Sequence, residues 1–378
     1  MSFQLSAAAL SSPEGIGSFE QSWHAFLLEV KKPSEDLKQR AVSIVDLFSG
    51  VGGLSLGLTQ AIRSLGMRAE YLFAADSNER ALEVYSNNFN PLATFGESVA
   101  KLVQQDGPGD MNSARFVAKP KISTSELNQF IGKVDFLIAG PPCQGFSTMN
   151  NYSRYDDHRN ELYMSAPALA VALEARYVII ENIPNVVNDK NSIVDAAISL
   201  LKAHGYHTRT RLISSADLGW PQMRRRFFLT AWKPDYGDNC AAPQEQVEAT
   251  RIPLPMSWAI EDLIDYQVDD DPFNSPTKLS PSNQARVEYL FDNNIYDLPL
   301  NQRPKCHRGG TRYTGVYGRM RWNEPSPTIL PGFFSPCRGR FVHPHRRRVL
   351  TPHEAARLQG FPDWFDFRPK KNSARRTD

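Results

Sequence analysis

The fold class of this 378-residue chain is decided by the stretch Ser43-Ile44-Val45-Asp46-Leu47-Phe48-Ser49-Gly50-Val51-Gly52-Gly53. Its first half is a short apolar run, typical of a buried strand, and its second half is a glycine-rich turn. Apolar residues at helical spacing follow, from Leu54 to Leu65. The stretch therefore predicts a strand, a tight turn and a helix. In such a unit, backbone N–H groups at the carboxyl edge of a sheet approach a ligand.

Three further apolar runs predict that this unit belongs to a larger sheet. They cover residues 71–75, 134–139 and 177–180, and helical stretches such as 193–204 separate them. Strands that alternate with helices form a doubly wound, mostly parallel sheet. Near its end, 208–214 and 226–231 flank a turn and are expected to be antiparallel. We therefore expect an α/β, Rossmann-like domain.

Residues 43–232 form the expected catalytic and cofactor-binding domain. Changes in amino-acid composition predict further regions on either side of it. Residues 1–42 are expected to be an N-terminal extension. Proline and aspartate become frequent after Trp232, so 233–319 is expected to be a small, loop-rich region. Residues 320–378 are expected to return to the catalytic domain.

A helix is predicted within this last segment. Thr351 is a good N-cap, Pro352 suits the first helical position, and Glu354 stands at capping-box spacing. Gly360 is expected to close the helix.

Bulk properties narrow the class of protein. A hydrophobic content of 41% is enough for one large core or for a large and a small domain. No stretch approaches the roughly 20 apolar residues of a membrane span, and the N-terminus lacks a signal-type pattern. We expect a cytoplasmic protein. The four cysteines and the histidines show no zinc spacing, so no metal site is predicted.

Charge is distributed unevenly although the net charge is only +2. Between Arg303 and Arg348 the only acidic residue is Glu324, whereas arginines recur and aromatic residues are interleaved with them. This pattern suits a nucleic-acid phosphate backbone. A solvated loop region is the alternative that the charge pattern leaves open.

Two motifs indicate chemistry at the carboxyl edge of the sheet. Ala139-Gly140-Pro141-Pro142-Cys143-Gln144-Gly145-Phe146-Ser147 follows a buried strand, and its prolines stiffen the approach to the thiol. A cysteine thiolate there can attack an electrophilic ring carbon. Glu181-Asn182-Ile183-Pro184 ends the next strand, so Glu181 is expected beside Cys143 as a proton donor. The alternative for Glu181 is a carboxylate that caps a loop.

A basic motif follows in Gln222-Met223-Arg224-Arg225-Arg226. Alternate residues of a strand share a face, so Arg224 and Arg226 are expected on one side of it. Two guanidinium groups there could hold a base oxygen or a flanking phosphate. Arg225 is equally compatible with a basic surface strand.

In their order, these motifs resemble those of the C5-cytosine DNA methyltransferases of the bacterial restriction–modification type. The resemblance runs from about Ser43 to Asp363 and rests on residues 46–53, 140–144, 181–183, 222–226 and 348–362. It implies an S-adenosyl-methionine-dependent enzyme that methylates C5 of a cytosine flipped out of double-stranded DNA. It further implies that 233–319 recognises the target sequence, that the protein is associated with the bacterial nucleoid through DNA, and that a cognate restriction endonuclease accompanies it.

The resemblance also assigns roles to single residues. Cys143 would attack C6 of the cytosine and Glu181 would hold N3, while Arg224 and Arg226 would steady the base and the catalytic loop 147–162. Asp76 would bind the ribose of S-adenosyl-methionine, and Glu97 its adenine amino group, with Asp110 as a rival. The other residues that would line or border the cofactor pocket are Phe48, Gly50, Val51, Gly52, Pro142 and Leu162.

One departure and three alternatives accompany this interpretation. The family's terminal Gly-Asn or Gly-Asp-rich segment is found neither before Asp378 nor in residues 1–42. We therefore expect either a truncated chain or a partner chain that supplies this segment. An RNA (tRNA) cytosine-5 methyltransferase and a non-catalytic DNA-binding subunit are the main alternatives. A nicotinamide dehydrogenase is less compatible, because Ser55 stands at the third glycine position of the dinucleotide fingerprint.

Overall fold

The computed structural model describes residues 13–104, 119–142, 162–188, 192–234, 251–266, 271–308 and 315–369. The chain divides into two units. The sheet unit contains residues 33–213, 225–243 and 365–378, and the loop-rich unit contains 1–32, 214–224 and 244–364. Among the described residues, no helix is long and apolar enough to cross a membrane.

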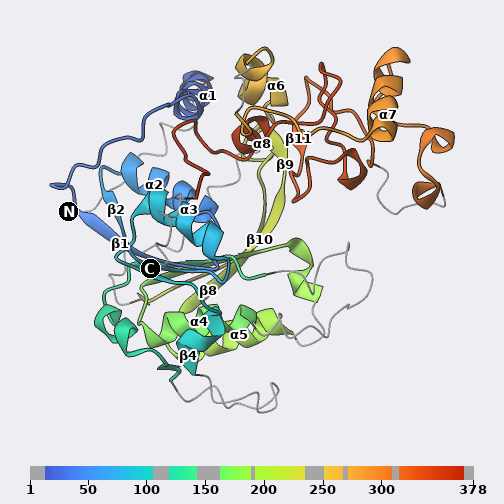
Figure 1. The fold of residues 1–378 in the computed structure, drawn as a ribbon. Coiled ribbons are helices and arrows are strands. Elements are labelled where there is room, and N and C mark those ends of the chain that lie inside the picture. The colour runs from blue at the N-terminus through green and yellow to red at the C-terminus, as the bar shows by residue number, and fades with distance from the viewer. Residues whose placement is uncertain are drawn as a thin grey trace, which may run out of the picture. The chain divides into compact units, whose positions relative to one another are not determined.

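A seven-stranded sheet forms the centre of the sheet unit (Figure 1). Neighbouring strands in β3-β2-β1-β6-β7 pair in parallel, β10 is antiparallel to β7, and β8 lies beside β10 at the edge. In this order across the sheet, the strands are β3 (Ala93–Phe95), β2 (Arg68–Ala75), β1 (Ala41–Leu47), β6 (Phe136–Ala139), β7 (Tyr177–Asn182), β10 (Arg225–Trp232) and β8 (His207–Ser214). The predicted doubly wound, mostly parallel sheet is confirmed.

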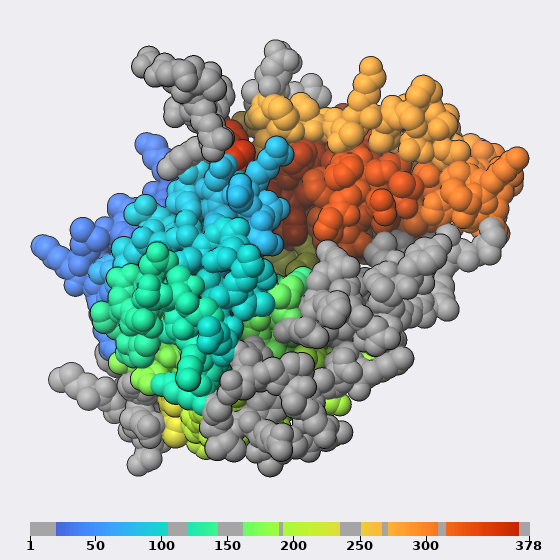
Figure 2. Space-filling view, turned by 60° about the horizontal axis from the view of Figure 1, so that its bottom comes forward, coloured from blue at the N-terminus to red at the C-terminus, as the bar shows by residue number. Residues whose placement is uncertain are grey.

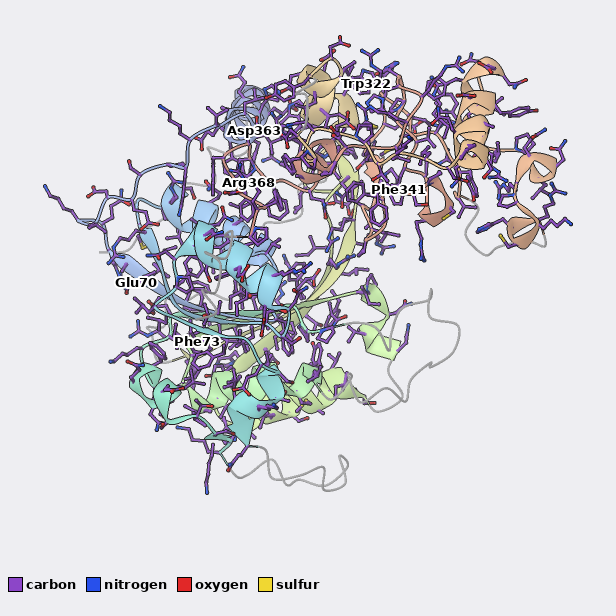
Figure 3. The ribbon with its side chains drawn as sticks, in the orientation of Figure 1. Glu70, Phe73, Trp322, Phe341, Asp363 and Arg368 are labelled. Carbon is purple, nitrogen blue, oxygen red and sulfur yellow. The ribbon has the colours of Figure 1, made fainter. Side chains whose placement is uncertain are left out.

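Helices cover both faces of this sheet (Figure 1). On one side lie α2 (Gly53–Ser64) and α3 (Glu79–Phe89), and on the other α4 (Leu162–Ala172) and α5 (Ile193–Ala203). Helix α4 is buried on nearly all sides, and Phe73 of β2, labelled in Figure 3, lies in the same apolar core. The smaller elements are η2 (Val99–Leu102), β4 (Val103–Gln104), β5 (Lys121–Ile122), η3 (Ser125–Phe130) and η5 (Pro184–Asn188).

The glycine turn after β1 has the backbone geometry that its sequence predicts. Phe48, Gly50 and Gly52 have φ angles of +55°, +52° and +97°, and Gly52 is the N-cap of α2. A methyl group on Gly52 would lie 2.1 Å from Cε2 of Phe89 in α3. Only glycine satisfies both the left-handed backbone and this close approach.

The loop-rich unit consists of short elements. Its longest helices are α1 (Pro13–Leu27) and α7 (Pro281–Asp292), and its strands β9 (Gln222–Met223) and β11 (Ser326–Pro327) pair in parallel. A core cluster includes Val287, Leu290 and Val342. The remaining elements are α6 (Met256–Ile260), η8 (Glu261–Leu263), η9 (Leu300–Gln302), η10 (Lys305–His307), η11 (Pro336–Arg338) and α8 (Pro352–Leu358).

Helix α8 begins with the predicted capping box. The Thr351 side chain accepts a hydrogen bond from the backbone N–H of Glu354, and the Glu354 carboxylate accepts one from the backbone N–H of Thr351. Gly360, with φ of +88°, follows the helix as expected.

The last segment of the sheet unit begins at Phe365, whereas the sequence predicted that the chain returns to this domain at residue 320. The guanidinium of Arg357, 1% exposed, binds Asp363 and Asp262 and thereby keeps α8 within the loop-rich unit. Beyond this point, Asn88 of α3 exchanges two hydrogen bonds with the backbone of Asp366. Residues 13–27, expected in an N-terminal extension, form α1 of the loop-rich unit.

Candidate active site

The glycine turn faces a carboxylate from the neighbouring strand. Strands β1 and β2 pair in parallel up to Leu47 and Ala75, so the residues that follow them emerge at the same edge of the sheet. Oδ2 of Asp76 accepts a hydrogen bond from the backbone N–H of Gly50 at 2.8 Å, and Oδ1 accepts one from Asn78 at 2.8 Å. Among the residues that the structure describes, none has an atom within 4 Å of a methyl group placed on Gly50, so these residues leave open space beside the turn. A fixed carboxylate beside an open glycine turn fits the ribose of a nucleoside cofactor.

Beneath this turn lies a buried polar cluster that sequence reasoning missed. Asp46, 1% exposed, accepts a hydrogen bond from Oγ of Ser55 at 2.6 Å, and the Tyr85 hydroxyl lies 2.8 Å from the same Oγ. Because the serine proton goes to the carboxylate, the tyrosine hydroxyl donates to Ser55. Burial raises the pKa of the Asp46 carboxyl from 3.8 to about 7, against the lowering effect of the Ser55 hydrogen bond.

The departure from the glycine fingerprint was the signal that could have revealed this cluster. Ser55 stands where dinucleotide-binding proteins have a third glycine, and its hydroxyl serves a buried aspartate. Ser55 therefore has a structural role that a glycine could not fill.

The turn that leads to the predicted nucleophile is described up to Pro142. Strands β6 and β7 pair in parallel as far as Ala139 and Ile180, which brings Gly140 next to Glu181. A methyl group on Gly140 would lie 4.0 Å from Oε2 of Glu181. The Asn182 side chain, which is buried, donates a hydrogen bond from Nδ2 to the Pro141 carbonyl oxygen at 3.3 Å. The turn before Cys143 is thus tied to the strand that carries Glu181.

Some predicted residues lie outside the described part of the chain. These are Cys143, Asp110 and residues 147–161 of the expected catalytic loop. Leu162, the last residue of that loop, is the first residue of α4. Pro142 is half-buried at the end of the described turn.

The carboxylate of Glu181 is paired with one of the two predicted arginines. Strand β10 runs antiparallel to β7 with Phe228 opposite Glu181, and Nε of Arg226 lies 2.7 Å from Oε1 of Glu181. The side chains of Arg226 and Glu181 are 19% and 18% exposed, so the pair is largely shielded from water. The opposite charge holds the carboxylate in a defined orientation.

Arg224 does not share a strand with Arg226. Strand β9 ends at Met223 and β10 begins at Arg225, so the argument from alternation along one strand does not apply to Arg224. Its backbone N–H and carbonyl both contact the Ser215 side chain, and the two residues belong to the loop-rich unit. Strand β9 pairs with β11, whereas β10 pairs with β7.

Glu97 follows β3 at the edge of the sheet. Its carboxylate is 43% exposed and lies 3.7 Å from Nζ of Lys101. Among the residues that the structure describes, no group of three or more His, Cys, Asp or Glu side chains could hold a metal ion.

The parallel strand order, the glycine turn after β1 and the carboxylate after β2 are those of the Rossmann-like, S-adenosyl-methionine-dependent methyltransferases, and the chain is of this class. Within that class, residues 42–377 match the family model of the C-5 cytosine-specific DNA methylases. The chain therefore belongs to this family and is a DNA cytosine-5 methyltransferase.

Known relatives agree with this assignment. The chain is 40% identical over 350 residues to the Type II methyltransferase M1.BsuMI of Bacillus subtilis, covering 92% of this chain and 78% of the relative. It is 26% identical to the Type II methylase M.HgiDII of Herpetosiphon aurantiacus, covering 87% and 86% of the two chains. The solved structure of the Entamoeba histolytica methyltransferase EhMeth shares the fold, with a TM-score of 0.54 at 16% identity and coverage of 89% and 90%.

Proposed function

We propose that this chain transfers a methyl group from S-adenosyl-methionine to C5 of a cytosine flipped out of double-stranded DNA, with Cys143 as the nucleophile. The observation that carries the proposal is the Glu181 carboxylate, which Arg226 holds at 2.7 Å beside the Gly140 turn that leads to Cys143. A nucleophile and a proton donor from adjacent parallel strands can act on one ring.

The cofactor would occupy the open side of the glycine turn. Asp76 is oriented by Gly50 and Asn78 and can accept hydrogen bonds from ribose hydroxyls. Phe48, Val51, Gly52, Pro142 and Leu162 would border the pocket, and Glu97 or Asp110 would bind the adenine amino group. When bound, S-adenosyl-methionine supplies an activated methyl group on a sulfonium.

The protein residues would activate the cytosine ring. Sγ of Cys143 would bond to C6 while Glu181, which would first take up a proton on the oxygen that Arg226 does not hold, would give that proton to N3, so that an electron pair becomes available at C5. C5 then accepts the methyl group. A base removes the C5 proton, the bond between Sγ and C6 breaks, and N3 returns its proton to Glu181. The ring aromaticity and both side chains are restored.

Base flipping follows from this geometry, because C5 and C6 cannot be reached from above or below the ring inside a base stack. Duplex DNA is therefore the partner that we propose for the site. The name of the Bacillus relative, a Type II methyltransferase, supports a place in a restriction–modification system with a cognate endonuclease.

A covalent trap tests the nucleophile directly. Duplex DNA with 5-fluorocytosine at the target cannot lose its C5 substituent as a proton, so the adduct should persist after methylation, and mass spectrometry should locate it on Cys143. Cys143→Ser should form no adduct and transfer no methyl group, because a neutral hydroxyl is a much weaker nucleophile than a thiolate. Cys306→Ser and Cys337→Ser are the matched controls and should react like the wild type. An active preparation that forms no adduct, or forms it elsewhere, overturns the assignment.

A further inference from the structure

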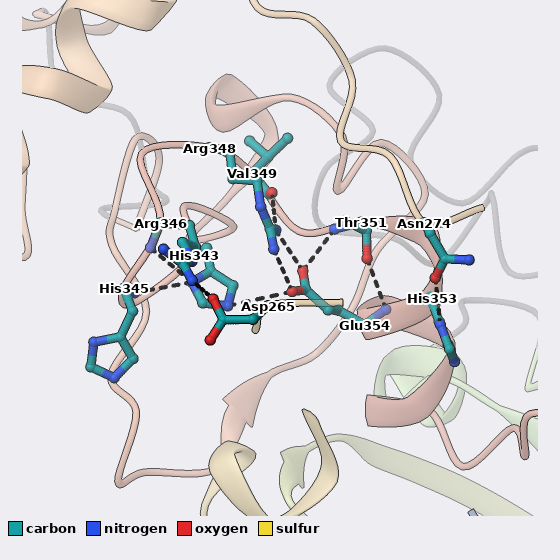
Figure 4. A network of polar contacts seen from close by, with 10 residues as sticks. All are labelled: Asp265, Asn274, His343, His345, Arg346, Arg348, Val349, Thr351, His353 and Glu354. Carbon is teal, nitrogen blue, oxygen red and sulfur yellow. Dashed lines mark hydrogen bonds and ion pairs between the residues drawn. The ribbon is translucent and has the colours of Figure 1, made fainter. Parts of the chain in front are cut away.

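A tight turn from His343 to Arg348 in the loop-rich unit is folded around one buried imidazole (Figure 4). Nδ1 of His343 accepts hydrogen bonds from the backbone N–H groups of His345 and Arg346, both at 3.0 Å. Because Nδ1 accepts both bonds, the proton of the neutral ring lies on Nε2, 3.4 Å from Oε1 of Glu354. Burial lowers the pKa of His343 from 6.5 to about 4, so the ring is neutral at neutral pH.

The same turn is anchored to the start of α8. Both carboxylate oxygens of Glu354, which is fully buried, accept hydrogen bonds from the Arg348 guanidinium at 2.7 Å. The backbone N–H of Thr351 donates to the same carboxylate at 2.8 Å. The side chains of His343 and Arg348 therefore make their hydrogen bonds within the loop-rich unit. The three residues at the tip of the turn, His345, Arg346 and Arg347, are exposed.

Stacked arginines extend this cationic tip along the surface. The Arg319 guanidinium lies over the rings of Phe291 and Tyr296, at 4.1 and 5.1 Å from their centroids. Arg347 lies over the same Phe291 ring at 5.4 Å, and Arg321 over the same Tyr296 ring at 4.3 Å. The resulting order is Arg347, Phe291, Arg319, Tyr296, Arg321.

A hydrogen bond also fixes the stack of arginines and aromatic rings to the His343–Arg348 turn. Nε of Arg319 donates to the Pro344 carbonyl oxygen at 2.7 Å. In Figure 2 the orange residues of α7 and the red-orange residues after 315 form one continuous surface. A guanidinium stacked on a ring keeps N–H donors at its edge for a phosphate, and little side-chain entropy remains to be lost on binding.

Exposed carboxylates pair with the outward arginines. Arg346 contacts Asp265, Arg347 contacts Asp292 at 2.6 Å, and Arg321 lies 3.7 Å from Glu324. The side chains of Arg321, Arg346 and Arg347 are 45–48% exposed, so these pairs are in contact with water and hold the arginines only weakly. A phosphate group can replace each carboxylate.

We propose that Arg346, Arg347 and Arg321 form a preorganised contact to the phosphodiester backbone of duplex DNA that does not depend on base sequence. The identity of the partner rests on the proposed function. The proposal extends that function by separating a residue set that positions the duplex from the residues that read its bases.

The salt dependence of DNA binding tests this proposal. Binding of the full chain, with S-adenosyl-homocysteine present, would be measured by fluorescence anisotropy on a target duplex and a scrambled duplex at several salt concentrations. Arg346→Gln, Arg347→Gln and Arg321→Gln should each reduce the slope of log K against log salt by about 1. Each should weaken binding roughly eightfold at 0.1 M salt, equally on both duplexes. Arg368→Gln is the matched control, because Arg368 is 88% exposed and paired with Asp366 in the sheet unit. It should leave the slope unchanged.

Two reciprocal variants sharpen the test. Asp292→Asn and Asp265→Asn remove the competing carboxylates and should tighten DNA binding on both duplexes. Wild-type slopes for the arginine variants, losses confined to the target duplex, or tighter binding of tRNA than of duplex DNA each overturn the proposal. Adduct formation on 5-fluorocytosine DNA at low salt is measured separately. If the wild type forms no adduct but the arginine variants still reduce the slope of log K against log salt, only the catalytic proposal is overturned.

Discussion

Nε of Arg226 lies 2.7 Å from Oε1 of Glu181, across the antiparallel pairing of β10 with β7. The β10–β7 register brings together two residues that belong to separate motifs of the sequence. A carboxyl group that must donate a proton to a ring nitrogen has to be held in one direction, and the Arg226 side chain provides this restraint at Oε1. The other oxygen, Oε2, is the one near the Gly140 turn.

Replacing Arg226 tests this restraint. Arg226→Gln should lower the single-turnover rate of methyl transfer by roughly 10- to 100-fold, since a hydrogen bond to a charged group contributes about 1.5–3 kcal/mol. Affinity for S-adenosyl-homocysteine should stay near the wild-type value. Arg225→Gln, at an exposed position of the same strand, is the control. A wild-type rate in Arg226→Gln would show that Glu181 needs no such partner.

Asp76 is the residue whose loss should affect the cofactor most directly. Asp76→Ala removes the acceptor for Gly50 N–H and for the ribose hydroxyls, and should weaken S-adenosyl-homocysteine binding by about 1–3 kcal/mol in calorimetry. Glu70→Gln, near the start of β2 and therefore far from the end that leads to Asp76, should bind normally. An unchanged dissociation constant in Asp76→Ala would remove this residue from the pocket.

The buried Asp46 carboxyl predicts a pH dependence of stability. Its pKa is about 7 in the folded chain and near 3.8 when exposed, so the folded state binds the proton more tightly. The stability that it contributes is complete below about pH 4 and is lost as the pH rises to 7. The free energy of unfolding should therefore fall, relative to Asp46→Asn, by up to about 1.4 kcal/mol per pH unit in this window. Urea denaturation of both proteins between pH 4.5 and 7.5 measures the difference. A difference that stays flat contradicts the prediction.

Gly50 and Gly52 form a matched pair for the turn itself. Both have positive φ, but within the described part of the chain only a methyl group added to Gly52 would meet another side chain, that of Phe89. Gly50→Ala should cost about 1–2 kcal/mol, the penalty of left-handed backbone in a residue with Cβ. Gly52→Ala should cost clearly more, because Phe89 must also move. Thermal denaturation of both variants compares them, and equal losses would mean that Phe89 adapts freely.

Local signals in the sequence determined the elements of the sheet unit. Strands β1, β2, β6 and β7 and helix α5 were predictable because apolar runs and helical periodicity are properties of neighbouring residues. The capping box at Thr351 was predictable for the same reason, since its two partners stand three residues apart. The order of the motifs also indicated the family, which the family model confirmed.

Tertiary structure alone decided which distant residues meet. The Arg226–Glu181 pair depends on the register of β10 against β7, and the Asp46 cluster depends on how α2 and α3 pack on β1. Arg347 of the turn at His343 packs on Phe291 of α7, about fifty residues earlier in the chain. This packing, together with the hydrogen bond from Arg319 to Pro344, orders a basic stretch that the sequence left open as a solvated loop. Such contacts give no periodic pattern in the sequence. Each depends on strand register, burial and charge pairing between two segments, and the number of residues between those segments is not fixed.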